Sequence, residues 1–78
     1  MRSFEISIHS FQQLKAFVAL AMVQPFDVLV GNDRQQVNGK NYIGMSSLDF
    51  HRPLLVQVRC DESSYRRFQQ QALQLFAS

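Results

Sequence analysis

The sequence predicts a small α/β (α+β) domain in which three amphipathic helices cover one face of a four-stranded antiparallel sheet. Some short segments alternate apolar and polar residues, which is typical of half-buried strands, and others repeat apolar residues every three or four positions, as amphipathic helices do. The two kinds of segment follow the order β-α-β-β-α-β-α. With 46% apolar and 18% charged residues, we expect residues 1–78 to form one folded, soluble domain.

The first strand and the first helix meet near Ser10. Alternation over residues 4–8 predicts the strand, and the spacing of Ser10 and Gln13 predicts a capping box at the start of a helix. This helix should run from about Phe11 to Met22 and end before Pro25. Four aromatic residues at helical spacing, here and in the last helix, are expected in the core: Phe11, Phe17, Phe68 and Phe76.

A hairpin is predicted in the middle of the chain. Residues 26–30 alternate like a strand, and Gly31-Asn32-Asp33 tolerates the positive φ angles of a tight turn. The returning segment 34–38 is short and polar, as edge strands are. A short helix is then expected between residues 40 and 50.

The second half of the chain predicts one strand and one helix. Residues 54–60, entered through Pro53, alternate most regularly and should lie centrally in the sheet. Asp61 offers a capping oxygen, and apolar residues from Tyr65 onward repeat at helical spacing to the end of the sequence.

Composition excludes several functions. The net charge is only +2 and the basic residues are scattered, so we expect no nucleic-acid partner. No apolar run is long enough to cross a bilayer and the N-terminus does not resemble a signal peptide, which predicts no membrane insertion. The single Cys60 forms no internal disulfide, so a cytoplasmic location is expected.

The chain also lacks the motifs of common enzymes. Two histidines and one cysteine are too few for a closed zinc site, and each glycine stands alone, so no nucleotide-binding loop is present. We therefore predict no metal, no cofactor and no enzymatic activity. Cys60 is interpreted as a small buried apolar residue, and His51-Arg52-Pro53 as a structural entry to the last strand.

One arrangement could carry chemistry, namely His9 and Ser10 at the start of the first helix. Unpaired backbone N–H groups there favour an anion or a phosphoryl group. Three interpretations stay open: an ordinary loop histidine beside a serine cap, a phosphate-accepting His9, and an acid–base or ligand role.

Two segments give the chain a family resemblance. Val37 to Leu48 and Pro53 to Val58 resemble, in order and spacing, the third strand, regulatory helix and last strand of HPr, the histidine-containing phosphocarrier family of the bacterial sugar phosphotransferase system. The resemblance implies an open-faced β-sandwich rather than a ferredoxin-like plait. Four positions carry residue types common in that family: Lys40, Gly44, Ser47 and Leu48.

The departures from the family fall on its functional positions. The family's first helix opens with Gly-Leu-His-x-Arg-Pro, in which the histidine carries the phosphoryl group and the arginine steadies it. The resemblance places Ser10 at the carrier histidine, Gln12 at the arginine and Gln13 at the proline. The family's regulatory serine aligns with Asn41, and two positions of its docking surface align with Ile43 and Ser46.

The resemblance therefore implies a degenerate HPr-like protein that is phosphorylated at neither usual position. Its expected role is a protein-binding or regulatory module, with proteins of the sugar phosphotransferase system or a transcription regulator as partners. The alternative is a working phosphocarrier that uses His9 to relay phosphoryl groups from phosphoenolpyruvate to sugar transporters. The predicted partner-binding residues are His9, Ser10, Gln12, Asn41, Ile43 and Ser46.

Overall fold

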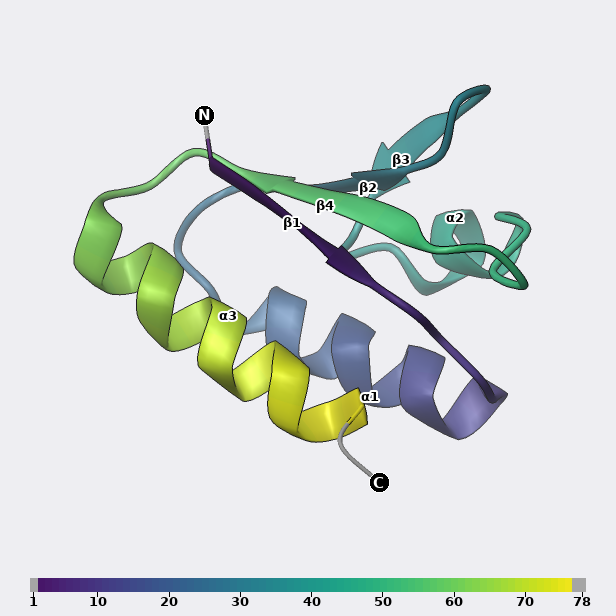
Figure 1. Ribbon diagram of the computed structural model, residues 1–78, viewed down its shortest axis with the longest axis horizontal. Helices are drawn as coiled ribbons and strands as arrows, with labels where there is room; N and C mark the ends of the chain where they lie inside the picture. Colours follow the sequence, from purple (N-terminus) through teal and green to yellow (C-terminus); the bar gives the residue numbers. More distant parts are fainter. Residues whose placement is uncertain (1, 77–78) are drawn as a thin grey trace.

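The computed structural model describes residues 2–76; Met1, Ala77 and Ser78, which include the predicted end of the last helix, lie outside the described residues. The order of elements agrees with the sequence prediction (Figure 1). The elements are β1 (Arg2–Ile6), α1 (Phe11–Met22), β2 (Val28–Gly31), β3 (Gln36–Asn38), α2 (Tyr42–Ser46), β4 (Leu54–Val58) and α3 (Glu62–Phe76).

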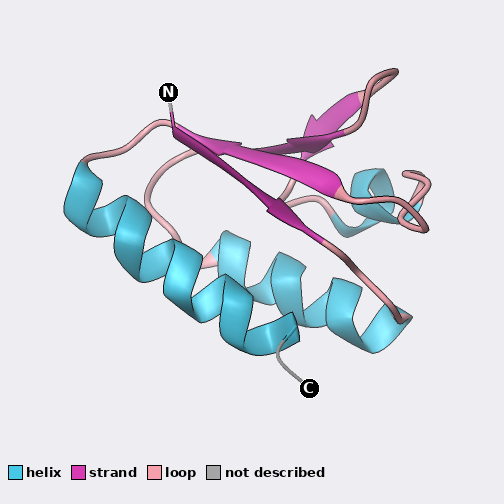
Figure 2. Ribbon diagram, in the orientation of Figure 1, coloured by secondary structure: helices cyan, strands magenta, loops and turns pink. Residues whose placement is uncertain are grey.

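The four strands form one antiparallel sheet in the order β1-β4-β2-β3. β4 lies inside the sheet and β3 at an edge, as predicted. The helices lie on one side of the sheet, with α1 and α3 side by side beneath it (Figure 2). The other face of the sheet has no covering layer among the described residues, which makes the architecture an open-faced sandwich.

The core lies between the sheet and the helices. Strand residues alternate between this core and the uncovered face; in β4, for example, Leu54, Val56 and Val58 are buried. Phe68 of α3 is fully buried and contacts the rings of Phe4, Phe17 and Phe26 at centroid distances of 5.9, 6.0 and 5.6 Å. Burial of one such ring contributes about 1.5–3 kcal/mol, so this cluster holds α3 against β1 and α1.

Several predicted boundaries were wrong by a few residues. The first strand ends at Ile6 rather than Ile8, although Ile8 is buried. Phe26 precedes β2 instead of opening it, because pairing with β4 begins at Val28, opposite Val58, the last residue of β4. β4 ends at Val58, so Cys60 lies just after the strand and is half-buried.

The mechanism predicted for the hairpin turn was also wrong. Gly31 is the last residue of β2, and no residue between 2 and 76 has a positive φ. The turn is closed instead by Asn32, whose backbone N–H donates to Gln35 O at 3.0 Å. The Asn32 Oδ1 atom accepts from the backbone N–H groups of Arg34 and Gln35. A side-chain oxygen therefore supplies what a left-handed glycine supplies in other hairpins.

Within residues 2–76, no helix has both the length and the apolar character that a membrane crossing requires.

Candidate functional site

The start of α1 is built by the predicted pair of Ser10 and Gln13. Ser10 is the N-cap in an extended conformation, and its Oγ accepts from Gln13 N at 3.2 Å. The Gln13 Oε1 atom accepts from the backbone N–H of His9 at 2.7 Å. This reciprocal bond reaches the residue before the N-cap, whereas a standard capping box bonds the N-cap itself. The helix start and the backbone of His9 are therefore held together.

The side chains at this helix start face solvent. His9, Ser10 and Gln12 are all exposed. The position that the resemblance assigns to the phosphoryl-steadying arginine carries the uncharged Gln12. The exposed imidazole of His9 thus lies beside the capping Ser10, and the position of the family's arginine carries no cationic side chain.

At the start of α2, too, the residue at a functional position of the family differs in type and caps the helix. Asn41 is the N-cap, and its Oδ1 accepts from Ile43 N at 3.0 Å and Gly44 N at 3.3 Å. Met45 N also donates to the backbone carbonyl of Asn41, at 2.9 Å. An amide therefore caps α2 at the position that the resemblance assigns to the regulatory serine.

Apolar side chains remain exposed on α2. Met45 and Leu48 are buried and anchor the helix to the core, whereas Ile43 is 77% exposed and Tyr42 is 39% exposed. The Ser46 side chain is half-buried and its hydroxyl donates to Ile43 O at 2.9 Å. Of the six predicted partner-binding residues, five are exposed and Ser46 is the exception.

Sequence reasoning missed Phe11, which was expected in the core. Its side chain is 58% exposed, because the first turn of α1 lies beyond the end of β1 (Figure 1). The Phe11 ring packs edge-to-face against Phe50, with 5.6 Å between centroids, and Phe50 in turn lies 5.7 Å from the ring of exposed His51. The position of Phe11 in the first turn, before the apolar repeat is complete, was the only signal in the sequence.

The Phe11–Phe50 contact joins the start of α1 to the connection that follows α2, and α1 and α2 pack against each other on this side of the molecule (Figure 1). We name this region the α1–α2 surface and define it by seven residues. They are His9, Ser10, Phe11, Gln12, Asn41, Tyr42 and Ile43. The surface combines exposed apolar groups with uncharged polar ones, a composition typical of protein-binding sites.

Cys60 lies away from this surface. Burial raises the pKa of its thiol, the charge of Asp61 raises it further, and Arg2 opposes the shift. A raised pKa disfavours the thiolate, which is the reactive form. The prediction that Cys60 is buried was wrong, because the residue follows the end of β4 and its side chain is half-buried.

The described residues contain no grouping of three or more His, Cys, Asp or Glu side chains that could ligate a metal ion.

The fold and the site together define an α+β open-faced β-sandwich with an exposed patch at the starts of its first two helices. Among solved structures, the chain is similar to "HPr-C-His" of Thermoanaerobacter tengcongensis, with a TM-score of 0.77 and 20% sequence identity. The match covers 100% of this chain and 98% of that one. The fold is therefore HPr-like, as the sequence resemblance implied. By sequence, the chain matches no protein-family profile and no curated protein.

Proposed function

We propose that this chain is a protein-binding or regulatory module on an HPr-like scaffold, which docks through the α1–α2 surface without relaying phosphoryl groups. One observation carries the proposal: the two positions that the resemblance assigns to phosphorylation are occupied by helix caps. Ser10 caps α1 and Asn41 caps α2.

Neither cap is suited to phosphotransfer. A serine hydroxyl needs a general base within hydrogen-bond reach to act as a nucleophile. Among the hydrogen bonds of residues 2–76, Ser10 Oγ accepts from Gln13 N and makes none to an imidazole. An amide such as Asn41 has no hydroxyl to phosphorylate. The resemblance also assigns a charge-steadying arginine to the position of Gln12, which carries no charge. These substitutions favour binding over transfer.

The exposed apolar groups support a docking role. Phe11 and Ile43 expose 58% and 77% of their surface, and Tyr42 adds an aromatic ring with a polar tip. A small number of large apolar or aromatic residues usually supply most of the binding energy of an interface. The partners proposed from the fold are proteins of the sugar phosphotransferase system or a transcription regulator, in the cytoplasm.

The test is a pull-down from the host with the purified chain as bait, followed by mass spectrometry for phosphotransferase proteins and transcription regulators. The double variant Phe11→Ser/Ile43→Ser should lose the partner. The matched control is Leu73→Ser, which changes a 47% exposed leucine on α3. Recovery of neither class of partner would count against the proposal.

A second function is supported by His9, whose imidazole is exposed beside the N-terminus of α1. Unpaired N–H groups at such a helix end favour a phosphoryl group on a neighbouring side chain. In this alternative, His9 would accept phosphate from phosphoenolpyruvate through the general phosphotransferase enzyme. Loss of phosphate uptake in His9→Ala would support the alternative, and absence of uptake in the unchanged chain would end it.

A further inference from the structure

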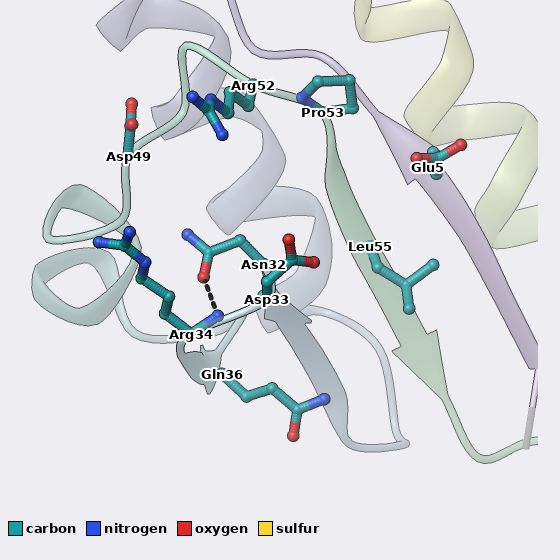
Figure 3. A pocket seen from close by; sticks show the side chains of 10 residues that line it. Glu5, Asn32, Asp33, Arg34, Gln36, Asp49, Arg52, Pro53 and Leu55 are labelled. Atoms are coloured by element: carbon teal, nitrogen blue, oxygen red, sulfur yellow. Dashed lines mark hydrogen bonds between the residues drawn. The ribbon is translucent and has the colours of Figure 1, made fainter.

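A hollow of about 470 Å³ opens on the uncovered face of the sheet, away from the helices. Its floor is formed by strand residues of that face, including Gly31 of β2 and Leu55 of β4, which are register partners. Its walls come from the β2–β3 turn and from the connection between α2 and β4 (Figure 3). The volume lies within the range of small-molecule sites, about 300–1,000 Å³.

The absence of a side chain at Gly31 leaves the floor of the hollow open. A Cβ atom at this position would lie 2.5 Å from Gln35 O and 2.8 Å from Gln36 Cγ. Because Gly31 has no side chain, Gln36 can reach across β2, and its Nε2 donates to Gln57 Oε1 at 2.6 Å. Beside it, Leu55 is 39% exposed and gives the floor an apolar patch.

Both signs of charge line the hollow. Figure 3 shows the guanidinium groups of Arg34 and Arg52 toward one side, Glu5 on the opposite side, and Asp33 between them. Among residues 2–76, the ion pair present is Arg66–Glu62 on α3, so these arginines and carboxylates do not pair with one another. The charged groups of the hollow therefore remain available to a ligand.

The turn that presents two of these charges is fixed. The hydrogen bonds from Arg34 N and Gln35 N to Asn32 Oδ1, at 2.9 and 3.0 Å, set the backbone from which Asp33 and Arg34 project. A preformed backbone lowers the entropy cost of binding. Asp49 lies on the arginine side of the hollow, and its Oδ1 accepts from His51 N at 3.1 Å (Figure 3).

We propose that this hollow binds a zwitterion of amino-acid size with an apolar side chain. Arg34 and Arg52 would receive the carboxylate, Asp33 and Glu5 the ammonium group, and Leu55 the apolar side chain. A simple anion would be repelled by the carboxylates of the hollow, and a simple cation would be repelled by its two guanidinium groups. Only a ligand that carries both charges gains from both sides, since unpaired charges lose their hydration when a site is filled.

The first test is an NMR titration of the full ¹⁵N-labelled chain with L-leucine, N-acetyl-L-leucine and L-leucinamide. Leucine should shift the backbone amides of residues 31–36 and 49–55. The acetylated compound lacks the ammonium group and the amide lacks the carboxylate, so each should bind at least about tenfold more weakly. Equal binding of either analogue, or no shift in these segments as leucine approaches its solubility limit, would overturn the proposal.

Variants locate the site within the chain. Arg52→Gln should weaken leucine binding about tenfold, because a charge-assisted hydrogen bond is lost. Asp49→Asn should strengthen binding, since it removes a carboxylate beside the incoming carboxylate. The matched control is Arg67→Gln, an exposed arginine on α3. Wild-type affinity in Arg52→Gln, or weaker binding in Asp49→Asn, would contradict the proposed orientation and overturn it.

Discussion

The ring of Phe11 stands edge-on to the ring of Phe50, at 5.6 Å between centroids and an interplanar angle of 77°. This contact joins the first turn of α1 to the connection between α2 and β4. More than half of the Phe11 surface is nevertheless exposed. Phe11 is thus held in place by an intramolecular contact while most of its ring stays available to a partner.

Phe11→Ala should therefore lower the affinity for a partner more than it lowers the stability of the fold. We expect the free energy of unfolding to fall by only about 0.5–1.5 kcal/mol, the contribution of one aromatic pair. Partner affinity should fall by about 2 kcal/mol or more, as for a hot-spot residue. Urea denaturation and titration with the recovered partner measure the two effects. Loss of about 3–5 kcal/mol of stability, typical of a buried phenylalanine, would contradict the exposed position.

Ser10→Ala should destabilise the chain by about 1 kcal/mol, because the Gln13 N–H loses its side-chain acceptor. Ser10→Asp should retain most of the stability, since a carboxylate caps a helix equally well and interacts favourably with its N-terminal dipole. Chemical denaturation of the three proteins provides the comparison. Equal stability of Ser10→Ala and the unchanged chain would show that Ser10 is not an effective cap.

Two glycine substitutions should have opposite effects. Gly31→Ala places a Cβ atom 2.5 Å from Gln35 O and should cost about 1–3 kcal/mol through overpacking. At Gly44, the nearest atom to an added Cβ is Val37 Cβ at 3.4 Å, so Gly44→Ala fits and should gain up to about 1 kcal/mol of helix propensity. Thermal or urea denaturation distinguishes them. A stable Gly31→Ala variant would contradict the close approach described for the β2–β3 turn.

Cys60 should react slowly with thiol reagents near neutral pH. Because burial raises its pKa, the folded chain keeps the thiol protonated at pH values where the unfolded chain has begun to ionise. The stability linked to this proton is present below the pKa of the unfolded thiol and is lost as pH rises through the folded pKa. Iodoacetamide labelling against pH, followed by mass spectrometry, should give a higher midpoint for the folded chain than for the chain in urea. A lower midpoint would contradict the shift.

Local signals predicted α1 well and the hairpin less well. Ser10 and Pro25 bracket α1, and its observed bounds, Phe11–Met22, match the prediction. The hairpin was located correctly. The predicted role of Gly31 in the turn was wrong, because Asn32 closes the turn with its side chain. Phe26 was misassigned because the start of β2 is set by the end of its partner β4, opposite Val28, which no local pattern reveals.

Only part of the candidate site was predictable from the sequence. The Ser10–Gln13 pair could be inferred from its spacing, and the resemblance identified the positions of Asn41 and Ile43. The exposure of Phe11 depends on where α1 begins relative to the sheet, and its contact with Phe50 depends on tertiary packing. The hollow above Gly31 and Leu55 likewise depends on strand register, which the sequence alone did not specify.

The central claim is that this HPr-like chain binds partners without accepting phosphate. The most direct test is its intact mass after incubation with phosphoenolpyruvate and the general phosphotransferase enzyme, with an authentic phosphocarrier as positive control. We predict no added phosphoryl group on this chain while the control is fully labelled. An acid-labile phosphoryl adduct that disappears in His9→Ala would contradict the claim and make the protein a carrier with a displaced acceptor.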